Sequence, residues 1–176
     1  MEYSIKEIVG VIGAKARNLQ DGTISILLTD SRRLSFPEQS LFFALKTKTN
    51  DGHRYIKELY KLRVRNFVVS ELLPEFESLP DANFLVVKDT LKALQKLAIH
   101  HRKRFNIPVI GVTGSNGKTT TKDMISAVLG TTYSVCRTVA NHNNEIGMCQ
   151  TLLSLKKEHG ACVVEMGMRG FGQIEE

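Results

Sequence analysis

Hydrophobic and polar positions in about the first hundred residues follow two periods. Apolar residues recur at helical spacing between Ser4 and Gly13, which supply a cap and a stop, so this segment is predicted to be a short amphipathic helix. The same spacing predicts helices over residues 52–63 and 90–105. Apolar, β-branched or aromatic runs bounded by turn residues predict four strands, at residues 23–28, 41–45, 66–70 and 83–87. We therefore expect a small mixed α/β domain.

Beyond residue 105 the pattern becomes a regular alternation of strand and helix. Strands are predicted at residues 109–113, 134–139 and 161–165, and helices at residues 118–129 and 145–155. This alternation is typical of a parallel sheet covered by helices. Because Pro108 ends the preceding helix, we expect a boundary that separates residues 1–105 from residues 106–176. Such sheets normally have more strands, so the chain is expected to be cut short.

A glycine-rich loop joins the first strand and helix of this second part. Its residues are Thr113, Gly114, Ser115, Asn116, Gly117, Lys118, Thr119 and Thr120. Glycines let backbone amides turn toward a polyphosphate, the lysine can reach its terminal phosphates, and the Thr119 hydroxyl can hold Mg²⁺. Val112 stands where the strict P-loop pattern has its first glycine. The loop predicts a nucleoside triphosphate site, and the alternative is a helix start that uses glycines only to turn.

Polar residues also follow the other two predicted strands of this part. Glu165 ends the last strand, so it should lie at the carboxyl edge of the sheet near the phosphate loop. A carboxylate there is a candidate second ligand for the Mg²⁺ held by Thr119, or an ordinary solvated glutamate. The segment from Asn141 to Asn144 opens on the same edge, where it can contact the nucleotide or serve as turn and cap residues.

Two polar loops follow strands in the first part of the chain. Ser31 and Arg32 lie in one, and Lys46 and Thr47 lie in the other. Their donors suit a phosphate or a uracil ring, although composition alone favours ordinary surface loops.

Composition and charge narrow the function classes. The chain has 176 residues, 42% of them hydrophobic, and its apolar runs are well short of the roughly 20 residues of a spanning helix. Charged residues near the N-terminus interrupt the basic and then apolar stretch that a secretory signal requires. The sequence therefore predicts a cytoplasmic protein without membrane contact. The net charge of +6 comes from dispersed basic residues, with one cluster at residues 100–104. This dispersion favours a polyanionic small substrate over nucleic acid, and no feature indicates an oligomeric state.

Cysteine usage adds a further exclusion. Cys136, Cys149 and Cys162 are widely spaced, odd in number and lack a C-x-x-C pair. They are predicted to be buried, reduced thiols and not a zinc site or a disulfide framework.

Four groups of residues occur in the order found in one known family. They are Asp30-Ser31-Arg32, then Leu41-Phe42-Phe43-Ala44-Leu45 with Asp51-Gly52-His53, then the loop from Thr113 to Thr120, then Asn141-His142-Asn143-Asn144-Glu145-Ile146-Gly147 with Glu165-Met166-Gly167. Together they resemble the Mur ligases of peptidoglycan synthesis, most closely those that add D-alanyl-D-alanine. The resemblance covers essentially the whole chain. Each group is weak alone, and the combination is specific.

The resemblance implies an α/β fold, with a small mixed α/β UDP-substrate domain followed by the start of a P-loop parallel-sheet ATPase domain. It implies ATP and Mg²⁺ as cofactors, and UDP-N-acetylmuramoyl-tripeptide and D-alanyl-D-alanine as substrates joined through an acyl phosphate. By motif position, Lys118 and Glu165 would be catalytic, and Thr119 and Glu165 would hold the metal. The remaining implied contacts are Asn144 and the loop from Thr113 to Thr120 for the nucleotide, and Ser31, Arg32, Lys46 and Thr47 for the UDP moiety.

Two positions depart from the family pattern. Cys149 replaces a common proline, and Gln173 replaces a glutamate in the Gly172-Gln173-Ile174 segment. Two alternatives stay open: another Mur or folylpolyglutamate-type ligase, and a non-catalytic nucleotide or UDP-sugar binding module. The Asp51-Gly52-His53 group and the doubled asparagine favour a D-alanyl-D-alanine ligase. Because the rest of the ATPase sheet and the family's C-terminal domain are absent from these residues, the chain alone is expected to be inactive.

Overall fold

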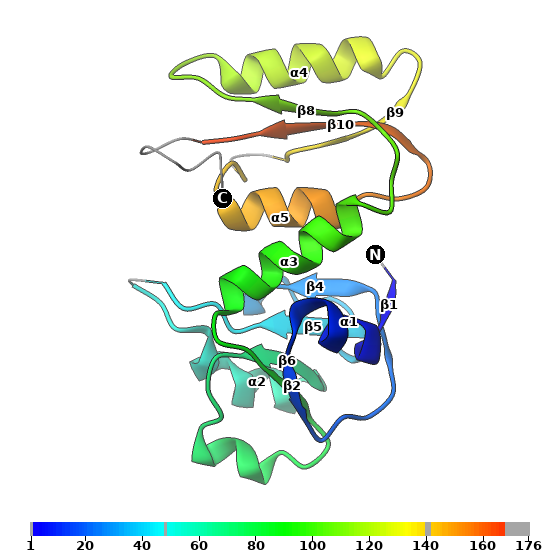
Figure 1. Ribbon diagram of the computed structural model, residues 1–176. Helices are drawn as coiled ribbons and strands as arrows, with labels where there is room; N and C mark the ends of the chain where they lie inside the picture. Colours follow the sequence, from blue (N-terminus) through cyan, green and yellow to red (C-terminus); the bar gives the residue numbers. More distant parts are fainter. Residues whose placement is uncertain (1, 48, 140–141, 168–176) are drawn as a thin grey trace. The chain divides into compact units, whose positions relative to one another are not determined.

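The computed structural model describes residues 2–47, 49–139 and 142–167 and divides the chain into two compact units (Figure 1). Unit 1 spans Met1–Leu97 and unit 2 spans Ala98–Glu176, so the division falls inside helix α3 (Thr90–Arg102). The sequence places it slightly later, near Pro108. Asn141 and residues 172–174, which the sequence analysis singled out, lie outside the described residues.

Unit 1 is built on a five-stranded sheet in the order β2-β7-β6-β5-β4. Its strands are β2 (Lys15–Arg17), β4 (Ile26–Leu28), β5 (Ser40–Phe43), β6 (Asn66–Val69) and β7 (Asn83–Val86). Strands β4 to β7 pair in parallel, and β2 pairs with β7 in the antiparallel sense. A second, two-stranded antiparallel sheet joins β1 (Tyr3–Ser4) to β3 (Thr23–Ile24).

The helices of unit 1 match the predicted positions. Helix α1 (Ile5–Ile12) begins at Ser4, whose hydroxyl accepts a hydrogen bond from the Glu7 amide, and ends at Gly13 in the left-handed region. The segment predicted as one helix from residue 52 begins as the 3₁₀ helix η3 (Gly52–Tyr55) and continues as α2 (Ile56–Lys61). Three more 3₁₀ turns complete the unit: η1 (Ser31–Arg33), η2 (Pro37–Gln39) and η4 (Pro74–Ser78).

Buried phenylalanines form the centre of unit 1. Phe67 and Phe76 stack on either side of Phe84, with ring centroids 5.6 and 5.2 Å away, and Phe42 meets Phe67 edge to face. Aromatic side chains of this kind bury large apolar areas and stabilise the sheet that carries the polar loops.

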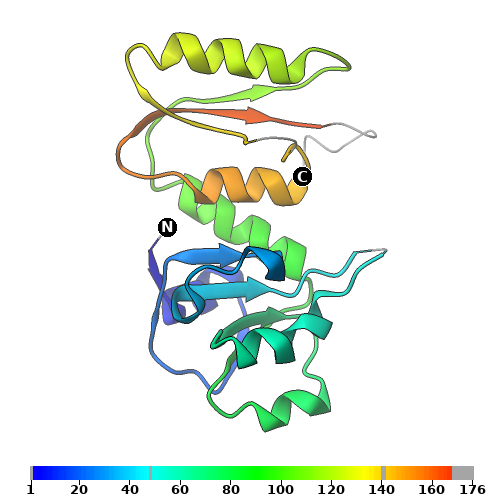
Figure 2. The same cartoon turned by 180° about the vertical axis from the view of Figure 1, so that it is seen from behind.

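Unit 2 contains a three-stranded parallel sheet in the order β8-β10-β9. Its elements are β8 (Val109–Val112), α4 (Lys118–Leu129), β9 (Ser134–Arg137), α5 (Glu145–Leu153) and β10 (His159–Glu165). Helix α4 covers one face of the sheet and α5 covers the other (Figures 1 and 2). All three cysteines are buried and free of disulfides, as predicted. No helix among the described residues is both long and apolar enough to cross a membrane.

A buried histidine joins the end of α3 to the core of unit 2. His101 is 3% exposed, and its Nε2 lies 3.0 Å from the Leu155 carbonyl oxygen, so the neutral ring donates a proton there. The Phe105 ring packs against it at 5.0 Å. Burial lowers the pKa of His101 from its ordinary value of 6.5.

We expect His101 to make unit 2 less stable in acid. Because its pKa is lower in the folded state, the unfolded chain takes up the proton first. Its contribution is therefore complete above pH 6.5 and is lost as the pH falls through 6.5 toward the folded pKa, by up to about 1.4 kcal/mol per pH unit. Urea unfolding of wild type and His101→Gln at pH 7.5 and 5.5 measures this difference. The control is His100→Gln, which should keep the wild-type pH dependence, and an unchanged dependence in His101→Gln would contradict the assignment.

Candidate active site and substrate loops

The glycine-rich loop lies between β8 and α4 and remains exposed to solvent. Gly117 has a φ of 72°, a left-handed conformation that favours glycine, and it directly precedes the helix. The first amides of α4 have no acceptors within the helix, so they are available to an anion at this end. Lys118 Nζ donates to the Gly114 carbonyl oxygen at 2.7 Å, which places the ammonium over the loop.

Glu165 ends the central strand of the sheet, directly beside the end of β8. Its side chain is buried, with Oε2 accepting a hydrogen bond from Thr119 Oγ1 and Oε1 accepting one from Asn143 Nδ2, both at 3.1 Å. The structure therefore brings together Thr119 and Glu165, as the sequence predicts. Glu165 is not the solvated strand-end residue of the alternative interpretation.

These two residues fit a hard divalent cation. Mg²⁺ takes carboxylate and hydroxyl oxygens together with phosphate oxygens, and Thr119 and Glu165 supply such atoms next to the phosphate loop. The metal role of both residues remains a proposal.

Asn144 is placed as a helix cap. Its Oδ1 accepts a hydrogen bond from the Gly147 amide at 2.8 Å at the start of α5. A nucleotide contact through this residue stays a prediction. The sequence did not single out the neighbouring Asn143 as a site residue, although the doubled asparagine pointed to this segment. The Asn143 side chain donates a hydrogen bond to Glu165.

Sequence reasoning also missed two polar residues around Glu165. Thr138 Oγ1 accepts a hydrogen bond from the Glu165 amide at 2.9 Å. Lys122 Nζ lies 3.6 Å from Glu165 Oε2 and its side chain is only 4% exposed. Helical spacing places Lys122 on the same side of α4 as Lys118 and Thr119, which was the available signal.

In unit 1, both predicted substrate loops follow the carboxyl ends of neighbouring parallel strands, β4 and β5. Ser31 begins η1, and Arg32 makes a two-bond contact with Asp30, through Nε to Oδ1 at 2.9 Å and Nη2 to Oδ2 at 2.7 Å. The Arg32 hydrogen bond lowers the pKa of Asp30 to about 2. Arg32 is thus oriented, but its charge already has a partner.

The loop after β5 is held by a small ion cluster. Lys46 Nζ lies 3.5 Å from both Asp51 Oδ2 and Glu71 Oε1, and these charges raise the pKa of Lys46. Thr47 closes a turn in which its amide donates to the Asn50 carbonyl oxygen at 2.8 Å. Lys46 and Thr47 remain exposed at this edge of the sheet.

His53 fixes the base of the same loop. It is 2% exposed, its Nδ1 lies 2.6 Å from Asp51 Oδ1, and its Nε2 accepts from the Ser70 amide at 3.1 Å. Ligand atoms of Asp51, His53 and Glu71 lie within 4.8 Å of one another. Because both ring nitrogens are engaged and Lys46 offsets the carboxylates, this cluster supports the loop without needing a cation.

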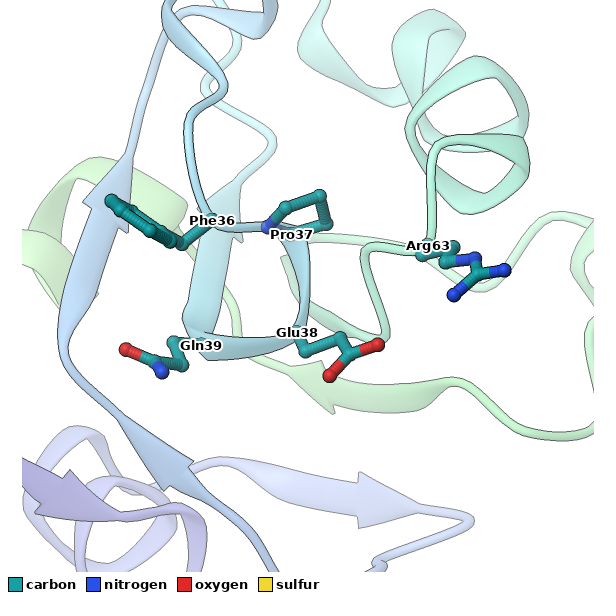
Figure 3. Close-up of a pocket in the computed structure, with 5 residues that line it drawn as sticks. All are labelled: Phe36, Pro37, Glu38, Gln39 and Arg63. Atoms are coloured by element: carbon teal, nitrogen blue, oxygen red, sulfur yellow. The ribbon is translucent and has the colours of Figure 1, made fainter.

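Unit 1 also has an open hollow of about 290 Å³, lined by Phe36, Pro37, Glu38, Gln39 and Arg63 (Figure 3). Four of these residues precede β5, so they belong to the amino end of that strand. The predicted substrate loops follow the carboxyl ends of the strands, and none of their predicted binding residues lines this hollow.

The strand, glycine-rich loop and helix, with the acidic end of the neighbouring strand, define unit 2 as the opening part of a P-loop domain. The family described as "Mur ligase middle domain" matches residues 112–176. UDP-N-acetylmuramoyl-tripeptide--D-alanyl-D-alanine ligase of Synechocystis is 46% identical over 88% of this chain and 33% of its own length. The enzyme of the same name from Bacillus subtilis is 39% identical over 99% of this chain and 38% of its own length.

Solved structures show the same relationship. The crystal structure of MurF from Acinetobacter baumannii matches with a TM-score of 0.90 and 29% identity, over 99% of this chain and 38% of that one. MurF ligase from Thermotoga maritima, solved in complex with ADP, matches with a TM-score of 0.72 and 29% identity, over 85% of this chain and 33% of that one. The chain belongs to the Mur ligase family and most resembles its D-alanyl-D-alanine ligases. It spans about a third of the length of the relatives it matches.

Proposed function

We propose that the polypeptide containing this chain is an ATP-dependent amide ligase that adds D-alanyl-D-alanine to UDP-N-acetylmuramoyl-tripeptide. The names of the similar proteins support this activity, and the ADP complex of one of them supports a nucleotide ligand. The observation that carries the proposal is the convergence of Thr119 with Glu165 beside the phosphate loop. A reaction that consumes ATP and a UDP-linked substrate is expected in the cytoplasm.

In this proposal the loop from Thr113 to Thr120 binds the ATP phosphates. A carboxylate oxygen of the tripeptide attacks the γ-phosphorus, and ADP leaves with the electrons of the broken P–O bond. The D-alanyl-D-alanine amine then attacks the acyl carbon, loses a proton, and displaces inorganic phosphate. Phosphoryl transfer depends mainly on position and charge neutralisation, which the amides of α4 and the Lys118 ammonium can supply.

Thr119 and Glu165 would hold Mg²⁺, which, when bound, offsets negative charge on the phosphate oxygens. Thr119 can present its oxygen to the cation while its proton remains directed at Glu165 Oε2. Asn143 orients the other carboxylate oxygen. Burial of Glu165 keeps its carboxylate away from bulk water, which strengthens the interaction of that carboxylate with charge.

The UDP moiety is assigned to Ser31, Arg32, Lys46 and Thr47. Arg32 and Lys46 offer charge-assisted donors to a diphosphate, and the two hydroxyls suit the ring or ribose. Both cations are paired with carboxylates in the structure, so they must share or exchange those partners when a diphosphate binds.

Phosphate release by the full-length polypeptide tests the function. The expected result is release that requires ATP, Mg²⁺, UDP-N-acetylmuramoyl-tripeptide and D-alanyl-D-alanine together, with formation of the pentapeptide product detected by mass spectrometry. Reaction with glutamate and a folate, or with an earlier amino acid and a shorter UDP-linked precursor, would identify another ligase of the group. Binding of nucleotide and UDP-substrate without turnover would identify a non-catalytic module.

Lys46→Ala should raise the KM for the UDP-linked substrate about tenfold and leave kcat nearly unchanged, because a charge-assisted contact made equally in ground and transition states is lost. The difference from wild type should shrink as salt is added. The matched control is Lys57→Ala, another exposed lysine of unit 1 that is paired with a carboxylate, Glu75, at 3.1 Å. Equal KM values for the two variants would show that this loop is an ordinary surface loop with no role in substrate binding.

A further inference from the structure

Lys122 is a buried lysine one helical turn beyond Lys118 on α4. It is 3% exposed as a whole residue, and lysine is seldom buried this far without a charged partner. Its ammonium points toward the end of β10, where Nζ lies 3.6 Å from Glu165 Oε2. An ion pair therefore connects the phosphate-loop helix to the central strand.

A second carboxylate near Lys122 is differently placed. Asp123 Oδ1 is also 3.6 Å from Lys122 Nζ, but its side chain is 51% exposed, and it receives a hydrogen bond from Arg137 Nη1 at 3.2 Å. Water and Arg137 thus already balance Asp123. Glu165 is 3% exposed at its side chain, so Lys122 supplies a countercharge where water cannot.

Within the part of the chain that the structure describes, the hydrogen bonds of the Glu165 side chain and amide to other side chains are with neutral groups. Thr119 and Asn143 each donate one hydrogen bond to the carboxylate, and Thr138 accepts from its amide. Neutral donors orient a carboxylate but leave its charge in place, and burying an unpaired charge is costly. The ammonium of Lys122 therefore completes the site before any cation arrives.

We infer that Lys122 is a positioning residue that acts as the built-in counter-ion of Glu165. It keeps the carboxylate in place in the metal-free protein and competes with the divalent cation for it, which sets the cation concentration at which the site fills. This inference rests on the proposed function, because it takes Glu165 as a cation ligand.

This competition predicts the direction in which removal of the Lys122 charge changes the cation affinity and the stability of the metal-free protein. Replacing the ammonium by an uncharged side chain of similar length, in Lys122→Met, leaves Glu165 without its countercharge in the metal-free state. A bound cation restores the balance and no longer meets a nearby positive charge. Lys122→Met should therefore be less stable without metal and should bind the cation about tenfold more tightly.

The experiment titrates Mn²⁺ into the full-length polypeptide with a non-hydrolysable ATP analogue and measures free Mn²⁺ by electron paramagnetic resonance. The variants are Lys122→Met, Glu165→Gln and the double substitution, each also melted in EDTA. Lys156→Met is the matched control, because it removes an exposed lysine 3.8 Å from Glu158 in the same unit and should change neither measurement.

We expect the Mn²⁺ dissociation constant to fall about tenfold in Lys122→Met and to rise in Glu165→Gln. In EDTA, the double substitution should lower the melting temperature by less than the sum of the two single changes, because it leaves neither charge unpaired. Lys122→Arg, which keeps the charge, should retain an Mn²⁺ dissociation constant within about threefold of wild type.

The outcomes separate the inference from the function on which it rests. If Mn²⁺ affinity is unchanged in both Lys122→Met and Glu165→Gln, the cation assignment of Glu165 fails, and this inference fails with it. If Glu165→Gln weakens Mn²⁺ binding while Lys122→Met leaves it unchanged or weaker, Lys122 is only structural and the proposed function survives. If Lys122→Met does not fold, the double substitution with Glu165→Gln tests the inference instead. A folded double variant would support the counter-ion role of Lys122, and a double variant that also fails to fold would overturn it.

Discussion

Lys118→Ala is expected to lower the ligase rate by about a hundredfold to a thousandfold with little change in the fold. The ammonium lies over the phosphate loop, 2.7 Å from the Gly114 carbonyl oxygen, and is the cation placed to meet charge developing on the transferring phosphoryl group. Residue 118 opens α4 at the solvent-facing loop, where alanine is a good helix former, so the core is unaffected. Steady-state phosphate release and thermal melting of the full-length polypeptide measure the two effects.

The control for this substitution is Lys156→Ala, which removes a lysine of the same unit from an exposed ion pair. It should keep the wild-type rate, because surface pairs of this kind contribute little. A near-normal rate in Lys118→Ala with unchanged melting would show that the loop does not serve phosphoryl transfer. A loss of activity that follows a loss of folding would remove the catalytic interpretation.

Gly52→Ala is expected to destabilise unit 1 by about 1–3 kcal/mol, because the site has no room for a methyl group. A Cβ at this position would lie 2.8 Å from the backbone carbonyl carbon and Cα of Ala44 and from the Leu45 amide nitrogen. All three are main-chain atoms, so they cannot rotate away as a side chain would. The Gly52 amide also donates a hydrogen bond to the Leu45 carbonyl oxygen at 2.9 Å, which fixes this segment against Gly52. Relief therefore requires a shift of the loop that carries Lys46.

Gly10→Ala provides the contrast. Gly10 lies inside α1, and no atom beyond the adjacent backbone of that helix lies within 4 Å of a Cβ built there, so alanine should stabilise the protein by about 0.5–1 kcal/mol. Urea unfolding compares the two variants with wild type. Equal stabilities for Gly52→Ala and Gly10→Ala would disprove the close packing of Gly52 against Ala44 and Leu45, which directly follow β5.

Apolar periodicity located the main helices and strands because each buries a face of fixed period. Helix α1, for example, buries Ile5, Ile8 and Ile12 at helical spacing, and the expected parallel sheet is confirmed. The strand predicted at residues 23–28 is divided, because β3 pairs with β1 while β4 pairs with β5. The strand with which a segment pairs is distant in sequence, so the periodicity of the segment itself does not reveal it. The antiparallel edge strand β2 was missed for a related reason, since Lys15 and Arg17 make it polar.

The site was predictable where one short segment carries the chemistry. The glycine-rich loop and Glu165 could be proposed as site residues because a glycine turn and a strand-end carboxylate have recognised uses. Lys122 was not found, since a lysine at helical spacing is ordinarily a solvated residue and only the fold shows that this one is buried. The pairing of Arg32 with Asp30 likewise depends on the local 3₁₀ turn.

The order of strands in unit 2 has a consequence for how the chain acquires its structure. Among the described strands of this sheet, β10 is the last in sequence yet lies between β8 and β9, so these two strands pair with it only after it has been made. Contacts between residues far apart along the chain form slowly, and strands that wait for a partner expose edges on which other chains can pair. During synthesis, the glycine loop is therefore made well before the strand that brings Glu165 to Thr119, so the contact between these two residues forms only after β10 has joined the sheet.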